Sequence, residues 1–413
     1  MNADKIYLIF IALLIIEQVI ELALNILNIR QARREAPNMP DVLMNLYDGE
    51  AKKKSLEYTC AKCYFAIFSN LYSFALIILL LVGGIFPALN LWLENFNLLP
   101  IWQGVFFLLL ISLIFSMSSV PLSYYSSFIL EEKFGFNKST KKLWLKDQVM
   151  GLLLSITISL PIIYLLLYFM SFLSVYWWLY AAGLIICAQV FLAFIYPVWI
   201  APLFNKFVEL EEGELKNEIL KLVESVGYKS TGVYKIDGSK RSKHANAYFA
   251  GLGSSKRIVL FDTLISIMQP KEILAVLAHE IGHEKLGHIK KSLVFSALTV
   301  LVAFYLIATM YESESFYHAF GFAEPSNHAA LLIFSLLAGP VMYFVSPLFN
   351  GLSRRFEYQA DRFAIRAVGD YKPLASALAA LSKNSLSNLN PHPAYSFMHY
   401  SHPTLSERIR AMS

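Results

Sequence analysis

The stretch EILAVLAHEIGHEKL, residues 272–286, decides how this chain is interpreted. His279 and His283 are four residues apart. In a helix, that spacing places both imidazoles on one face, one turn apart. Pro270 lies just upstream, where proline favours the first turn of a helix. The apolar residues predicted for the buried face of this helix are Ile273, Val276, Leu277 and Ile281.

This pattern is typical of a zinc site. Two ring nitrogens one turn apart can bind one zinc ion, and Glu280 between them can act as a general base on a water. Gly282 costs about 1 kcal/mol in a helix interior, so we expect another element to pack closely there.

A zinc site of this kind needs a third protein ligand. Glu357, in the stretch FEYQAD at 356–361, is the best candidate, because it follows an apolar run directly. Asp361 lies one turn further along the same face and could accept a hydrogen bond from a ligand histidine, which would fix its tautomer.

Composition predicts a membrane protein. Of the 413 residues, 56% are hydrophobic and only 16% are charged, against roughly 25% charged in soluble domains. Mean hydropathy is +0.51. Three cysteines are too few for a disulfide scaffold. Seven apolar runs are long enough to span a bilayer, approximately at 6–27, 64–86, 101–123, 149–170, 177–200, 292–311 and 329–349. The third could continue as one helix through Leu130.

Lysine and arginine orient these runs. Basic residues are frequent after the first and third runs, whereas the connections 87–100, 171–176 and 312–328 contain none. Positive residues stay on the cytosolic side, so we expect the N-terminus outside and the C-terminus in the cytosol. The net charge of +5 follows this pattern and does not indicate nucleic-acid binding.

The predicted fold class is therefore an all-α polytopic membrane protein, with a cytosolic α+β segment that carries the histidine motif. Residues 1–203 would hold the first five transmembrane helices, 204–290 the cytosolic segment with the histidine motif, 291–350 the last two helices, and 351–413 a cytosolic segment that completes the zinc site. Within 204–290 we expect a charged helix over 209–226 and strands at 232–236, 246–249 and 257–261.

The chain resembles the integral-membrane zinc CAAX prenyl endopeptidases of type 1, the a-factor-converting family. The matching stretches are EEKFGFNKST at 131–140, YP at 196–197, PLFNKF at 202–207, NAYF at 246–249, HEIGH at 279–283 with His288, EYQAD at 357–361, and His402-Pro403 with Arg408. The histidine motif alone is shared by many proteases, but its combination with seven spans and these blocks is specific.

The resemblance implies that the cytosolic part is a zincin-like α+β catalytic domain, with 204–290 as its zinc metallopeptidase segment. It also implies a large chamber between seven helices, with one zinc ion held by His279, His283 and Glu357 at its cytosolic end. Glu280 would activate the water. The substrate would be a prenylated C-terminal peptide, from which the aaX tripeptide is released.

Further roles are carried over from the same resemblance. Asn246 and Ala247 match the edge strand that would pair with the substrate backbone. His402 would stabilise the oxyanion, and Arg408 would pair with a substrate carboxylate.

Other histidines receive no ligand role. If the helix continues, a position five residues after His283 turns His288 away from the ligand face. The remaining histidines, His328 among them, are predicted at the surface or in loops. Glu17 and Glu21 are expected to face the chamber, because exposure of a carboxylate to lipid is costly.

Two alternatives remain open. One is a heat-shock-type membrane quality-control protease with the same zinc chemistry, which is typically shorter. The other is a transporter or channel with a structural zinc. We expect a monomer in the lipid bilayer. A bacterial inner membrane is favoured over the endoplasmic reticulum, because residues 411–413 carry no retrieval signal.

Overall fold

Seven long apolar helices make up most of the molecule. The computed structural model describes every residue except 1, 35–47, 174, 229–231 and 251–256. Within this part of the chain, seven helices are long and apolar enough to cross a membrane: Ala3–Ala32, Gly49–Val82, Pro100–Phe134, Lys141–Phe172, Trp177–Phe204, His288–Met310 and Asn327–Val368. The predicted number of spans is confirmed, and the third helix continues beyond Leu130 as expected.

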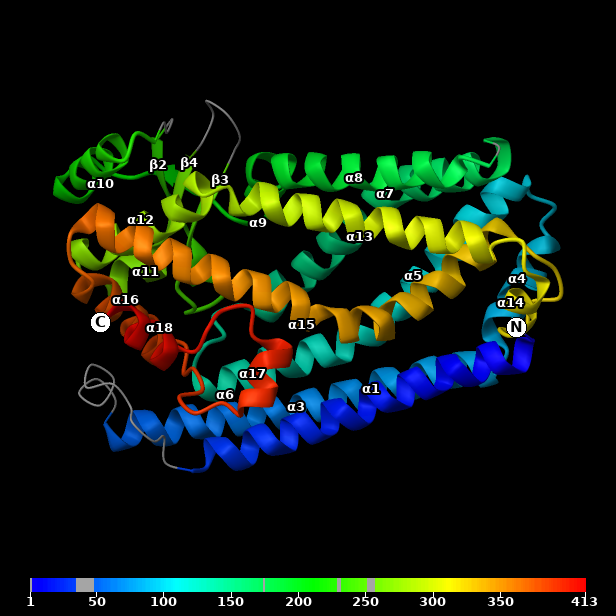
Figure 1. Ribbon diagram of the computed structural model, residues 1–413, viewed down its shortest axis with the longest axis horizontal. Coiled ribbons are helices and arrows are strands. Elements are labelled where there is room, and N and C mark those ends of the chain that lie inside the picture. The colour runs from blue at the N-terminus through cyan, green and yellow to red at the C-terminus, as the bar shows by residue number, and fades with distance from the viewer. Residues whose placement is uncertain (1, 35–47, 174, 229–231, 251–256) are drawn as a thin grey trace.

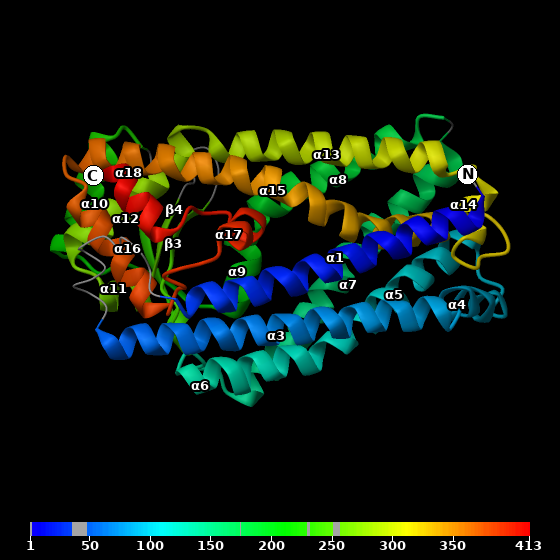
Figure 2. The ribbon, with the colours of Figure 1, turned by 60° about the horizontal axis from the view of Figure 1, so that its bottom comes forward.

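The long helices lie roughly along the long axis of the molecule, and the small sheet lies at one end (Figures 1 and 2). In chain order they are α1 (Ala3–Ala32), α3 (Gly49–Val82), α5 (Pro100–Tyr125), α7 (Lys141–Phe172), α8 (Trp177–Ile195), α13 (His288–Met310) and α15 (Asn327–Val368). π-Helical turns η1 (Ser126–Glu131) and η2 (Tyr196–Ile200) join α5 to α6 (Glu132–Phe134) and α8 to α9 (Ala201–Phe204).

We call the end of the molecule that carries the sheet the sheet end, and the opposite end the far end. The C-terminus lies at the sheet end and the N-terminus at the far end (Figure 1). Short helices α4 (Ile85–Glu94) and α14 (Glu314–His318) lie at the far end. A core of large aromatic side chains, including Phe86, Phe107, Phe316 and Tyr317, holds the helices together there.

The sheet has four strands in the order β1-β2-β4-β3. They are β1 (Phe207–Glu209), β2 (Gly232–Ile236), β3 (Ala247–Ala250) and β4 (Arg257–Phe261). β2 and β4 are parallel, whereas β1 and β3 each pair antiparallel on the outside. The position of β3 at an edge leaves one side of its backbone available for another strand.

Helices cover this sheet and extend the chain to its end. They are α10 (Glu214–Ser225), η3 (Gly238–Lys240), α11 (Asp262–Ile267), α12 (Pro270–Lys285), α16 (Lys372–Asn384), α17 (Pro393–His399) and α18 (Leu405–Met412). α12 packs against α10, β3, α15 and α16, and its buried residues Leu277 and Ile281 share a core with Ile258 and Leu260 of β4.

Two sequence predictions were wrong, one at the sheet end and one at the far end. The helix predicted over 209–226 begins only at Glu214, because Phe207–Glu209 pairs with β2 as strand β1. His328, predicted at the surface, is buried within α15 and its Nε2 lies 2.7 Å from Oδ1 of Asn90. The three predicted strands all form, with β3 displaced by one residue.

Candidate metal centre

Helix α12 places three of the predicted site residues. It begins at Pro270 with a capping box, in which Gln269 and Glu272 bind each other's backbone N–H groups. This satisfies two N–H groups that have no partner within the helix. The buried face holds the helix against the sheet, and His279, Glu280 and His283 line a cavity of about 750 Å³ on the other side.

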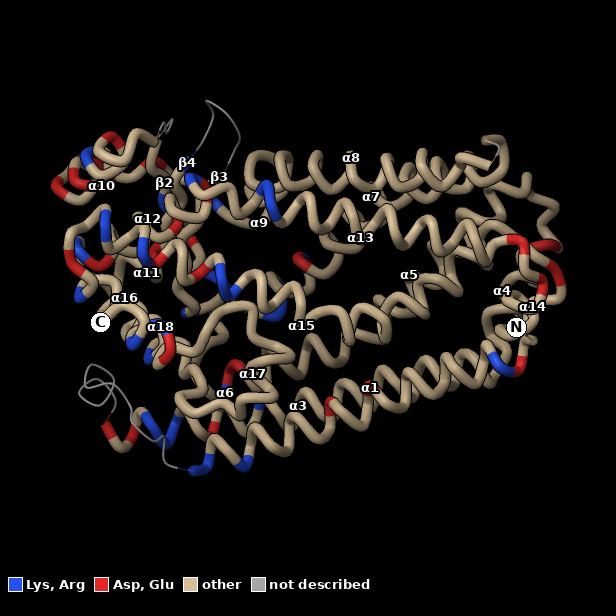
Figure 3. Tube along the Cα trace, in the orientation of Figure 1, with Lys and Arg blue, Asp and Glu red and all other residues tan. Residues whose placement is uncertain are grey.

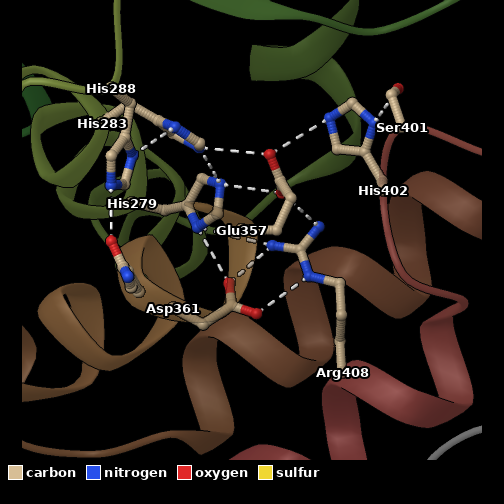
Figure 4. Close-up of polar contacts among 9 residues, drawn as sticks. His279, His283, His288, Glu357, Asp361, Ser401, His402 and Arg408 are labelled. Carbon is tan, nitrogen blue, oxygen red and sulfur yellow. Dashed lines mark hydrogen bonds and ion pairs between the residues drawn. The ribbon is translucent and has the colours of Figure 1, made fainter. Parts of the chain in front are cut away.

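Glu357 reaches this cavity from α15 (Figure 4). Its carboxylate lies 3.4 Å from Nε2 of His279 and 3.2 Å from Nε2 of His283. One ligand atom from each of the three residues lies within 4.8 Å of the others. Among the described residues, no other group of three histidine, cysteine or acidic side chains converges in this way.

The donor set fits a divalent metal. The two Nε2 atoms of His279 and His283 face each other at 3.1 Å. Oε2 of Glu357 is buried and makes no hydrogen bond of normal geometry, although Nη1 of Arg408 lies 3.3 Å and Nε2 of His279 3.4 Å from it. A cation between the three side chains would give this buried oxygen a closer partner. Two imidazoles and one carboxylate are a ligand set typical of catalytic zinc.

Asp361 and Arg408 support the first histidine. Oδ1 of Asp361 lies 2.8 Å from Nδ1 of His279. Arg408 donates from Nε and Nη2 to Asp361, at 2.9 and 2.6 Å, and its Nη1 lies 3.3 Å from Oε2 of Glu357. Because the carboxylate of Asp361 faces Nδ1, it directs Nε2 of His279 toward the metal position.

His288 supports His283, the second histidine of the pair. The sequence did not predict this supporting contact. Nδ1 of His288 lies 3.0 Å from Nδ1 of His283, and its Nε2 lies 2.9 Å from Oε1 of Gln359. The expectation that His288 turns away assumed one continuous helix. α12 ends at Lys285, however, and Gly287, with φ +69°, redirects the chain so that His288 begins α13 beside His283. The glycine was the available signal.

His402 faces Glu357 from the segment before α18. Its Nε2 lies 3.3 Å from Oε1 of Glu357, and its Nδ1 lies 2.9 Å from Oγ of Ser401 (Figure 4). The side chain is 63% exposed, so a bound molecule could reach it.

Asn246 and Ala247 lie at the start of the edge strand. Oδ1 of Asn246 accepts from the N–H of Ala247 at 2.8 Å, and its backbone carbonyl accepts from Phe261 of β4. β3 packs against α12, so this edge lies beside the helix that carries the histidine pair.

Comparison with known proteins supports one family throughout. The model of the CAAX prenyl protease N-terminal region, five membrane helices, matches residues 28–206, and that of peptidase family M48 matches residues 209–413. CAAX prenyl protease 1 of Saccharomyces cerevisiae is 40% identical, over 91% of this chain and 88% of its own. The CAAX prenyl protease 1 homolog of Homo sapiens is 35% identical, over 93% and 90%. This chain belongs to the CAAX prenyl protease 1 family.

A solved structure extends the likeness to the fold. The crystal structure of S. mikatae Ste24p superimposes with a TM-score of 0.93 at 38% identity and covers 99% of both chains. As a member of the CAAX prenyl protease 1 family, the chain is a multi-pass membrane metallopeptidase, as the sequence predicted.

Proposed function

We propose that this chain is a zinc endopeptidase that removes the last three residues of prenylated C-a-a-X substrates. The observation that carries the proposal is the convergence of His279, His283 and Glu357 in the cavity that Glu280 also lines. These three residues would hold the zinc. When bound, zinc supplies a Lewis acid that polarises a carbonyl and lowers the pKa of water.

Glu280 is proposed as the general base. Burial raises the pKa of its carboxyl group, against the opposing charges of His279 and His283. A raised pKa suits proton transfer, because a base works best near the operating pH. Glu280 would take the proton of the attacking water and later pass it to the leaving amine.

His402 is proposed to donate a hydrogen bond to the oxygen that becomes negative in the transition state. Its exposed ring, 3.3 Å from Glu357, is within the site and open to substrate. Asp361 is proposed to fix the tautomer of His279. The pairing of Arg408 with a substrate carboxylate stays a prediction.

The proposed substrate has two parts. An extended peptide would pair with the free edge of β3 at Asn246 and Ala247 through backbone hydrogen bonds. A prenyl chain would enter the larger cavity between the helices, of about 1350 Å³ and lined mainly by apolar side chains. Glu17 and Glu21 line the same cavity, as expected from the sequence.

The test compares a farnesylated C-a-a-X peptide with its unprenylated twin, with and without a zinc chelator. The metal-loaded protein should cleave the farnesylated peptide faster, and chelation should abolish cleavage of both. Equal rates for the two peptides would instead favour a quality-control protease.

Glu280→Gln tests the mechanism. With metal content unchanged, cleavage should fall by about 10²- to 10⁴-fold, the usual contribution of a general base. Glu224→Gln is the matched control, because Glu224 is an exposed residue of α10, and this variant should keep the parental rate. A Glu280→Gln variant that retains zinc and cleaves at the parental rate would show that Glu280 is not the base.

We further propose a monomer with its N-terminus outside and its C-terminus in the cytosol. The relatives named above are eukaryotic, which favours a eukaryotic membrane over the bacterial one expected from the sequence. The predicted domain boundaries stay predictions.

A further inference from the structure

A second cavity, of about 630 Å³, adjoins the metal centre. It shares His402 and Arg408 with the cavity that holds Glu280. From there it extends to polar side chains of α1 and α3, including Asn28 and Lys62. A molecule at the metal centre could therefore continue into this second cavity past His402.

The chain direction of β3 indicates which part of a substrate would enter the second cavity. Antiparallel pairing is the more stable arrangement of two strands. A peptide paired antiparallel to the free edge of β3 runs toward the beginning of that strand, at Asn246. His244, two residues before Asn246, lines the second cavity. The residues on the carboxyl side of the cleaved bond would thus occupy this cavity.

A substrate that ends there brings a negative carboxylate, which needs a cation. Arg408 is only 7% exposed, and each of its three side-chain nitrogens already contacts a carboxylate of Asp361 or Glu357. If Arg408 bound a substrate carboxylate, it would have to weaken contacts that support the metal ligands.

Lys62 is the lysine that lines this cavity. Its ammonium lies over the ring of Tyr58, 5.3 Å from the centroid. No carboxylate among the described residues lies within salt-bridge distance of it; the nearby Glu131 accepts a hydrogen bond from Tyr58 at 2.7 Å and lies 3.5 Å from His244. Glu131 lines the same cavity and interacts with the charge of Lys62 at longer range, but no ion pair among the described residues occupies the ammonium, so a ligand carboxylate could contact it directly.

We propose that Lys62 binds the C-terminal carboxylate of the substrate and so sets the distance from the chain end to the cleaved bond. The proposal rests on the function proposed above. Three extended residues span about 10 Å, so a substrate held in this way would place its cleaved bond about that far from the Lys62 ammonium. Lys62 is thus a specificity residue for substrates that end three residues beyond the cleavage site.

The experiment uses the full-length, metal-loaded protein and two farnesylated peptides of identical sequence, one with a C-terminal carboxylate and one with an amide. The parental protein should show a KM for the amide about tenfold higher, as expected for one lost hydrogen bond to a charged group. Lys62→Met should raise the KM of the acid peptide to that of the amide and leave the KM of the amide unchanged. Lys62→Arg should restore most of the difference.

Lys54→Met is the matched control, since Lys54 lies on the same helix, is exposed and does not line the cavity. The amide peptide reports folding, because a misfolded Lys62→Met protein would lose activity on both peptides. Equal loss on both would assign Lys62 a structural role and overturn the proposal.

Other outcomes separate the two proposals. If the parental protein cleaves acid and amide equally well, the protease function stands and recognition of the carboxylate is refuted. If Lys62→Met still discriminates as the parental protein does, the carboxylate binds elsewhere, as the prediction for Arg408 has it. If the parental protein cleaves neither peptide, both proposals fail.

Discussion

His279 lies between two carboxylates, and these determine its protonation in the metal-free protein. Its Nδ1 lies 2.8 Å from Asp361 and its Nε2 3.4 Å from Glu357. Burial alone would lower the pKa of His279, but the two carboxylates raise it to about 9, from an ordinary value of 6.5. Without metal, His279 is therefore protonated at neutral pH.

Zinc must displace this proton, so metal binding should depend on pH. Below about pH 9, apparent zinc affinity should fall about tenfold for each unit of decreasing pH, since one proton leaves for each metal bound. A competition titration with a chelator measures this. An affinity that stays constant from about pH 9 to about pH 7 would contradict the raised pKa.

The raised pKa of His279 also determines how the stability of the metal-free protein changes with pH. The pKa of His279 is higher in the folded than in the unfolded protein. Protonated His279 and its two carboxylate partners therefore stabilise the metal-free protein fully below about pH 6.5. That contribution is lost as pH rises through about 9. Metal-free and metal-loaded samples should thus differ most in thermal stability at alkaline pH.

At the scale of elements, the site depends on the close approach of α12 and α15. A Cβ on Gly282 would lie 3.2 Å from both Cα of Ala360 and Cβ of Phe363. This confirms the expectation that another element packs at the glycine. The approach holds His283 on α12 within reach of Glu357 on α15.

Gly282→Val should separate these helices, because backbone atoms of α15 cannot move aside without moving the helix. We expect loss of bound zinc and a lower melting temperature, measured by metal analysis and thermal unfolding. Gly151→Val in α7 is the control, since a Cβ there meets nothing within 4 Å. Full zinc content in Gly282→Val would contradict this account of the helix contact.

The sequence predicted those parts of the site that depend on helical periodicity. His279, Glu280 and His283 belong to one helix, and Glu357 and Asp361 to another, so local spacing places each set. His288 was missed because Gly287 interrupts the period. The contacts of Arg408 with Asp361, 47 residues away in sequence, depend on tertiary packing that no local pattern contains.

Strand β1 was missed for a related reason. Phe207–Glu209 is short and runs into a series of acidic residues, which read as the start of the charged helix that follows. Its pairing with β2 supplies the hydrogen bonds that define it. Lys216 then binds Glu209 and Glu212 at 2.8 and 2.6 Å, which holds the start of α10 against the strand.

At the scale of the whole molecule, charge is separated along the long axis. Lysine and arginine gather at the sheet end, whereas acidic side chains dominate the far end (Figure 3). The connections 87–100 and 312–328 at the far end contain no lysine or arginine. Since basic residues are retained in the cytosol, this separation carries the proposed orientation, with the metal centre on the cytosolic side.

Single cysteines can test the orientation in a background whose three native cysteines are replaced. Glu324→Cys lies exposed at the far end, and Lys221→Cys lies exposed on α10 at the sheet end. In sealed right-side-out vesicles, a membrane-impermeant maleimide should label Glu324→Cys directly and Lys221→Cys only after permeabilisation. Peptide cleavage by the parental protein should need the same permeabilisation, because the metal centre and α10 lie at the same end. Labelling of Lys221→Cys in intact vesicles, together with cleavage of added peptide, would show that the proposed orientation is wrong. The lysine- and arginine-rich end would then lie outside the cytosol, against the rule that basic residues are retained there.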